Sequence, residues 1–184
     1  MDKAEAVLRK IEQAVQSRFL PIVGRKKGAL LESLVTKKQP KLILEIGTLV
    51  GYSAILMARN LKNGKIVCIE ISPRAAAISR ENIKEAGFEE IIKVIVGDAL
   101  DALPALEGLF DFVFIDAAKE EYLKYLQLLE KKSAVKKGCI IVADNAKIFA
   151  DAMRDYLHYV RNSGKYKSQF HDFREDGMEV SVRL

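Results

Sequence analysis

Short apolar runs alternate with longer amphipathic runs after Pro40, and this alternation constrains the fold more than any other feature. Apolar residues in the short runs would face both sides of a sheet, as in a parallel sheet covered by helices on each face. These strand-like runs span residues 41–47, 65–71, 91–97, 110–116 and 138–144. The intervening runs have helical spacing and span residues 52–61, 73–87, 98–106 and 120–132.

The two ends of the chain differ from this centre. Residues 1–40 carry two runs with helical spacing and predict a helical N-terminal cap. Residues 166–173 and 178–184 flank a glycine-containing turn, which is typical of a hairpin. We therefore predict one domain over residues 1–184, in which 41–184 form a Rossmann-like α/β core. Its doubly wound, seven-stranded, mostly parallel sheet would carry helices on both faces and end in an antiparallel hairpin.

Composition suits a soluble globular protein, with 49% hydrophobic and 30% charged residues. The sequence contains no run of about 18 apolar residues that would span a membrane. The charged N-terminus lacks the apolar centre of a signal peptide, so we expect a cytoplasmic protein. Cys68 and Cys139 lie in strand-like runs and are expected to be buried and reduced.

The turn after the first strand predicts part of the ligand. Gly47 and Gly51 form an E-x-G-x-x-x-G pattern, and Leu49 stands where an NAD fingerprint has its middle glycine, which disfavours pyrophosphate. Glu45 suits an amino group. Ser53 and the start of the following helix suit a carboxylate. Together these groups indicate an amino acid moiety.

Glu70 ends the second strand, where an acid can bind two ribose hydroxyls. The segment 97–100 follows the third strand and could line a base pocket. A nucleoside joined to an amino acid is S-adenosylmethionine. Taken singly, Gly47 could be an ordinary turn glycine and Glu70 a surface acid, and only their combination favours this cofactor. The predicted cofactor-binding residues are Glu45, Gly47, Thr48, Gly51, Ser53, Glu70, Asp98, Ala99 and Asp116.

Oxygen-bearing side chains follow the fourth and fifth strands. Asp116 ends one, and Asp144 and Asn145 end the other. Two carboxylates and an amide oxygen suit a hard divalent cation such as Mg²⁺. Helix capping is the plainer interpretation of Asp144 or Asn145 alone, but Asp116 and the cofactor pattern favour metal binding.

Lys119 lies three residues after Asp116, at the start of a predicted helix. A lysine at such a position is often only solvated. A nearby cation disfavours the charged form of lysine, and the neutral form can act as a general base. We therefore predict that Lys119 and Asp116 are catalytic.

These motifs resemble those of the metal-dependent class I S-adenosylmethionine O-methyltransferases, the catechol and caffeoyl-CoA O-methyltransferase group. The resemblance runs from about Gly28 to Leu184. It implies that Asp116, Asp144 and Asn145 bind the metal, that Lys119 is the catalytic lysine, and that the protein is a homodimer. It rests on "LEIGTLVGYS", "IEISP", "GDAL", "FIDAAKEEY", "IVADN" and "DGMEVSVR".

The acceptor is less constrained. After Asn145 the chain departs from the group and is expected to pass almost directly into a helix, which would leave a more open site. We favour a catechol-like or phenolic small molecule. Residues 1–41 hold ten Lys or Arg and four Asp or Glu, so an anionic acceptor, a CoA thioester or the hydroxyuridine of a tRNA, is the alternative. A non-catalytic nucleotide-binding protein is the alternative of another class.

Overall fold

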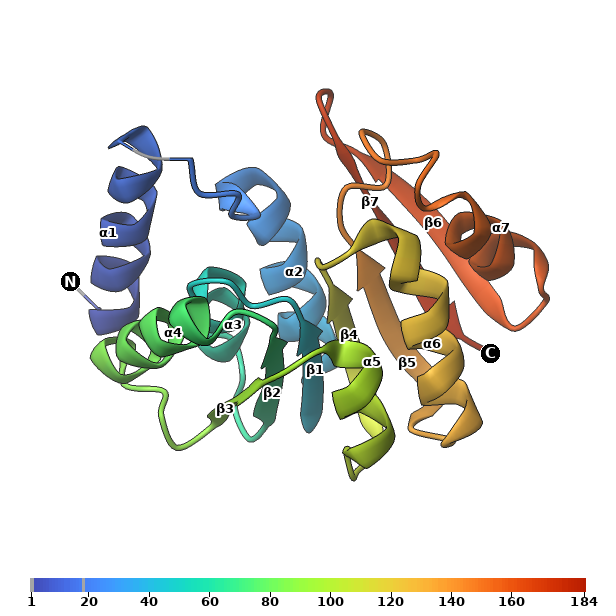
Figure 1. Cartoon of the computed structure of the whole chain (residues 1–184), viewed down its shortest axis with the longest axis horizontal. Coiled ribbons are helices and arrows are strands. Elements are labelled where there is room, and N and C mark those ends of the chain that lie inside the picture. The colour runs from blue at the N-terminus through green and yellow to red at the C-terminus, as the bar shows by residue number, and fades with distance from the viewer. Residues whose placement is uncertain (1, 18) are drawn as a thin grey trace.

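The computed structural model describes residues 2–17 and 19–184. Met1 and Arg18, both within the predicted cap, lie outside the described residues. The strands of the described part are β1 Leu42–Ile46, β2 Lys65–Glu70, β3 Ile92–Val96, β4 Phe110–Ile115, β5 Val135–Ala143, β6 Tyr166–Asp172 and β7 Gly177–Arg183. They form one seven-stranded sheet in the order β3-β2-β1-β4-β5-β7-β6 (Figure 1).

Strands β1 to β5 pair in parallel, and β7 pairs antiparallel with both β5 and β6. The predicted seven-stranded sheet with a terminal antiparallel hairpin is thus confirmed. The strand order reverses between β1 and β4, which lie side by side although β2 follows β1 in the chain. In open α/β sheets, ligands bind beyond the carboxyl ends of the strands at such a reversal.

Helices cover both faces of the sheet (Figure 1). They are α1 Lys3–Ser17, α2 Gly24–Lys38, α3 Tyr52–Ala58, α4 Pro73–Ala86, α5 Ala99–Ala102, α6 Tyr122–Lys131 and α7 Arg154–Asn162, with short 3₁₀ turns η1 Leu103–Ala105 and η2 Lys119–Glu121. Alternate strand residues enter opposite cores. Ile43 and Phe112 pack with the side of α1 to α4, whereas Leu44 and Val113 pack with the side of α5 to α7. This explains why the strands are apolar on both faces.

Helix α4 has the ends that its sequence predicts. The Ser72 hydroxyl accepts a hydrogen bond from the amide of Ala75, and Pro73 occupies the first turn. Gly87 ends the helix with φ 82°. Helix α5 is shorter than the predicted run over 98–106, since Pro104 cannot donate a helical hydrogen bond and the chain tightens into η1.

The segment after β5 differs from the expectation. Regular helix α7 begins only at Arg154, after a series of turns over residues 144–153. Asn145 adopts a left-handed conformation with φ 64°, which interrupts helical geometry. The amide of Ile148 then donates to Asp176 Oδ1 at 3.3 Å, and the amide of Ala146 donates to the carbonyl of Gly177 at 2.8 Å. Contacts with the distant hairpin therefore shape this segment.

None of the helices in the described part of the chain combines the length and the apolar character needed to cross a membrane.

Candidate active site

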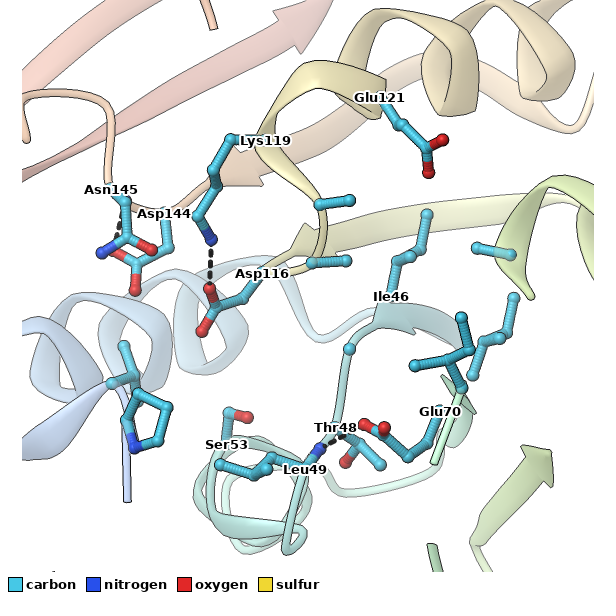
Figure 2. Close-up of a pocket in the computed structure, with 18 of the residues that line it drawn as sticks. Ile46, Thr48, Leu49, Ser53, Glu70, Asp116, Lys119, Glu121, Asp144 and Asn145 are labelled. Carbon is cyan, nitrogen blue, oxygen red and sulfur yellow. Dashed lines mark hydrogen bonds and ion pairs between the residues drawn. The ribbon is translucent and has the colours of Figure 1, made fainter. Parts of the chain in front are cut away.

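A cavity of about 670 Å³ lies beyond the carboxyl ends of β1, β2, β4 and β5. It brings together most of the residues predicted for the cofactor, the metal and the chemistry (Figure 2). These lining residues are Gly47, Thr48, Ser53, Glu70, Asp98, Ala99, Asp116, Lys119, Asp144 and Asn145. Its volume is within the range of small-molecule sites.

Glu70 joins the two turns at the cofactor end. Its Oε2 accepts a hydrogen bond from the amide of Leu49 at 2.8 Å, and its Oε1 accepts one from the amide of Ser72 at 2.9 Å. Leu49 has φ 50°, a conformation that a leucine rarely adopts, and the bond to Glu70 holds it there. The carboxylate is thereby fixed at the cavity wall (Figure 2).

Gly47 allows the turn after β1, which is the predicted cofactor-binding turn, to pack against Asp116 at the end of β4. Its φ is 88°, and a Cβ added there would lie 2.2 Å from the carbonyl oxygen of Asp116. The amide of Asp116 in turn donates to the carbonyl of Ile46 at 2.9 Å. Only a residue without a side chain permits this approach, which sets the spacing between the cofactor turn and Asp116.

Two predicted cofactor residues lie behind the cavity wall. Glu45 is fully buried, and its Oε1 accepts a hydrogen bond from the Ser53 hydroxyl. Burial raises the pKa of Glu45, and its Oε2 has no hydrogen-bond partner within the described part of the chain. Gly51 faces Ser79 of α4. Neither Glu45 nor Gly51, both described residues, lines the cavity, so in this structure they support the turn.

The three predicted metal ligands come from neighbouring strand ends. Ile115 pairs with Ala143 in the sheet, and the amide of Asp144 donates to the carbonyl of Ile115 at 3.0 Å, which brings Asp116 and Asp144 together. Burial and the negative charge of Asp116 raise the pKa of Asp144 to about 6. The ion pair with Lys27 opposes that shift.

Two lysines face the acidic corner, which is formed by Asp116 and Asp144 at the ends of β4 and β5. Lys119 donates to Asp116 Oδ1 at 2.8 Å and to the Tyr122 hydroxyl at 2.9 Å. Sequence reasoning did not identify Lys27, which donates to Asp144 Oδ1 at 2.6 Å and Oδ2 at 2.8 Å, and to Asp176 Oδ2 at 2.8 Å. Because Lys27 and Asp144 are 117 residues apart, no local pattern could have indicated the contact.

The donor atoms suit a hard cation. Within the described residues no group of three His, Cys, Asp or Glu side chains is arranged to hold a metal ion, and the predicted set instead combines two carboxylates with the amide of Asn145. Asn145 donates its Nδ2 to Asp176 Oδ2 at 2.7 Å, which leaves its carbonyl oxygen free for a cation. Two carboxylates and an amide oxygen are a donor set that Mg²⁺ accepts.

The mouth of the cavity is apolar. Phe19, Ile148 and Phe149 line it and are exposed. The Lys119 ammonium lies 5.9 Å from the centre of the Phe149 ring. Aromatic and aliphatic side chains at an open pocket favour a flat, apolar ligand.

Several basic residues of the N-terminal segment already have acidic partners. Arg25 pairs with Glu5 at 2.8 Å and with Glu12 at 2.6 Å, and Lys10 pairs with Glu85 at 2.6 Å. Lys27 pairs with Asp144, which lines the cavity, and with Asp176. The positive charge that the sequence concentrates in this segment is therefore partly neutralised in the fold.

Comparisons with known proteins agree with this geometry. The family model described as O-methyltransferase matches residues 3–159. Catechol O-methyltransferase B of Danio rerio is 37% identical over 174 residues, covering 88% of this chain and 65% of that protein. Catechol O-methyltransferase of Sus scrofa is 34% identical over 172 residues, covering 87% of this chain and 91% of that protein. The chain thus spans slightly less than two thirds of the first relative and nine tenths of the second.

Among solved structures, an O-methyltransferase from Bacillus cereus in complex with SAH has a TM-score of 0.86 and 28% identity, covering 97% of this chain and 91% of that chain. An O-methyltransferase from Streptomyces achromogenes in complex with SAM has a TM-score of 0.83 and 28% identity, covering 97% and 89%. Sequence motifs, sheet order and these similarities agree: the chain belongs to the O-methyltransferase family of class I, S-adenosylmethionine-dependent methyltransferases.

Proposed function

We propose that this protein transfers the methyl group of S-adenosylmethionine to a hydroxyl of a catechol-like or phenolic small molecule, with the help of a divalent cation such as Mg²⁺. One observation carries the proposal. A single cavity is lined at one end by Glu70 and Thr48 and at the other by Asp116 and Lys119. Cofactor and acceptor could therefore bind next to each other in this one cavity.

At the cofactor end, Glu70 is suited to the ribose hydroxyls, because a carboxylate oxygen that accepts one amide still has a second lone pair. Asp98 begins α5, where its Oδ1 accepts from the amide of Leu100 at 2.8 Å, and this bond holds the loop that would contact the base. Thr48 and Ser53 also line the cavity and suit the amino acid part of the cofactor.

At the acceptor end, Asp116, Asp144 and Asn145 would hold the cation. When bound, the cation lowers the pKa of an acceptor hydroxyl, and S-adenosylmethionine supplies the methyl group. Lys119 would accept the hydroxyl proton at its Nζ, acting as a neutral amine. Asp116 and the Tyr122 hydroxyl hold the Nζ at 2.8 and 2.9 Å, so its position is defined before an acceptor enters.

The apolar mouth supports a small phenolic acceptor over tRNA. Phe149 is 46% exposed and Ile148 55% exposed beside Lys119, a surface that an aromatic ring would cover. A polyanion would instead need several free cationic side chains around the cavity. In the part of the chain that the structure describes, Lys27 and Lys119 line the cavity and both already contact carboxylates.

The test is methyl transfer from labelled S-adenosylmethionine to a panel of catechols, simple phenols, CoA esters and unmodified tRNA. We expect transfer to catechols, loss of at least 100-fold in excess EDTA, and restoration by Mg²⁺. Lys119→Ala should lower turnover by about 10² to 10⁴-fold. Exposed Lys124→Ala, on α6 close to Lys119, is the matched control.

Unchanged turnover in EDTA would refute the cation. Methylation of tRNA but of no phenol would favour the alternative acceptor. Binding of the cofactor without transfer to any acceptor would favour a non-catalytic protein.

A further inference from the structure

Lys27 and Asp176 meet at the acidic corner from opposite ends of the chain. Lys27 lies in the first turns of α2, and Asp176 lies in the turn before β7. Their side chains are 2.8 Å apart and largely buried, with 14% of the lysine side chain and 12% of the aspartate side chain exposed. Neither was among the residues predicted from the sequence, and both contact predicted metal ligands.

Asp176 controls which end of the Asn145 amide faces the cavity. A carboxylate only accepts hydrogen bonds, so the group that contacts its Oδ2 at 2.7 Å must be the NH₂ of Asn145. The amide oxygen therefore points away from Asp176. The other carboxylate oxygen accepts from the amide of Ile148 at 3.3 Å, which ties the Asp176 side chain to the same segment.

Lys27 holds Asp144 and Asp176 beside one another. Its Nζ contacts both oxygens of Asp144 and one oxygen of Asp176. Two buried carboxylates in such proximity repel each other, and an uncompensated buried charge is strongly unfavourable. The ammonium of Lys27 removes most of this repulsion and restricts the rotation of Asp144.

We propose that Lys27 and Asp176 are positioning residues of the cation site: Asp176 keeps the Asn145 oxygen turned toward the cation, and Lys27 fixes Asp144. This inference rests on the proposed function, because it presupposes that Asp144 and Asn145 bind a cation. Neither residue is assigned contact with the acceptor or the cofactor methyl group. Partners that orient metal ligands commonly change metal affinity by about 10 to 100-fold when they are removed.

The experiment measures Mn²⁺ affinity of the full chain, with SAH at saturation, by the loss of the free Mn²⁺ electron paramagnetic resonance signal. We expect Asp176→Ala to weaken Mn²⁺ binding by about 10 to 100-fold. Asp176→Asn retains an acceptor and should lose less. Calorimetric titration with SAH in EDTA should give affinities within about twofold of the wild type, which shows that the variants are folded.

Lys27→Met separates two roles of the lysine. If Lys27 only repels the cation, its removal should make Mn²⁺ bind more tightly. A lysine that positions Asp144 gives weaker binding when removed, and Lys27→Arg should restore part of it. The matched control is the exposed pair Lys147 and Asp172, 2.9 Å apart on neighbouring segments. Its variants Lys147→Met and Asp172→Ala should bind Mn²⁺ as the wild type does.

The possible failures are distinguishable. Mn²⁺ binding to the wild type with unchanged affinity in Asp176→Ala, or tighter binding in Lys27→Met, would overturn the positioning role and leave the proposed function intact. A wild type that fails to bind Mn²⁺ at millimolar concentration would overturn the cation site and this inference together.

Discussion

Replacing Gly47 by alanine should destabilise the protein more than replacing Gly51, although the two glycines have similar backbones. Their φ angles are 88° and 84°, so the cost of placing an L-residue in the left-handed region, about 1–2 kcal/mol, is shared. Their surroundings differ. At Gly47 the new Cβ would lie 2.2 Å from the carbonyl oxygen and 2.9 Å from the carbonyl carbon of Asp116. At Gly51 the nearest atom is the Ser79 hydroxyl at 2.8 Å.

The magnitude follows from what can move. The Asp116 backbone is hydrogen-bonded to Ile46 and cannot retreat without disturbing the β1–β4 pairing, so the clash should add about 1–3 kcal/mol. The Ser79 hydroxyl has no hydrogen-bond partner in the described part of the chain and can rotate away. We therefore expect a loss of about 2–5 kcal/mol for Gly47→Ala and about 1–2 kcal/mol for Gly51→Ala.

Urea unfolding followed by circular dichroism gives the free energy of unfolding of each variant. Adding Ser79→Ala to Gly51→Ala should relieve any remaining clash and restore that part of the free energy of unfolding, but not the part lost to the left-handed backbone. Calorimetric titration with SAH should show the larger loss of affinity for Gly47→Ala, because Gly47 lines the cavity and Gly51 does not. Equal destabilisation of the two single variants, within about 0.5 kcal/mol, would refute the argument that the Asp116 backbone cannot yield.

Three further outcomes are expected. Glu70→Ala should weaken SAH binding by at least tenfold in calorimetric titration and lower stability by about 1–3 kcal/mol, because the amides of Leu49 and Ser72 lose their acceptor; Glu70→Gln should keep part of both. Hydrogen bonds from Arg25 and then Arg9 lower the pKa of Glu5 from 4.5 to about 2, so this acid contributes stability above pH 4.5 that is lost as the pH falls toward 2. These partners are partly exposed, so the contribution is only about 1 kcal/mol. Between pH 4.5 and 2, the free energy of unfolding of Glu5→Gln should therefore fall by about 1 kcal/mol less than that of the wild type. An equal fall in both proteins would contradict the assignment. Removal of divalent cations with EDTA should leave the SAH affinity within about threefold of that in Mg²⁺, since Glu70 and the turn after β1 would bind the cofactor themselves; a loss above 30-fold would show that the cation also holds the cofactor.

Local sequence features predicted the helices and strands, and which strand ends would carry the candidate cofactor and metal residues. Apolar residues on both sides of each strand indicated a sheet buried between helices, because burial on two faces disfavours polar side chains. Pro73 and Gly87 marked the ends of α4 because of their own backbone preferences. Asp116 and Asp144 could be grouped from their positions in the sequence, since the carboxyl ends of parallel strands share one edge of a sheet.

Local patterns did not separate residues that line the cavity from those that support its wall. Glu45 and Gly51 occupy motif positions beside the turn, yet Glu45 is buried behind Ser53 and Gly51 faces α4. The side on which a residue lies depends on how the turn packs against its neighbours. The start of α7 at Arg154 also depended on distant contacts, here between the segment after Asn145 and the terminal hairpin.

By itself, the sequence determined the α/β architecture, the family and the S-adenosylmethionine cofactor, because periodicity and short motifs are properties of neighbouring residues. Only the tertiary structure decided that Lys27 and Asp176 contact Asp144 and Asn145. Lys27 lies 117 positions from Asp144 and 149 positions from Asp176, and these contacts form because the fold brings the start of α2, the end of β5 and the turn before β7 to one corner. An ion pair across that distance leaves no periodic signal, since its energy depends on burial and on neighbouring charges that only the folded chain assembles.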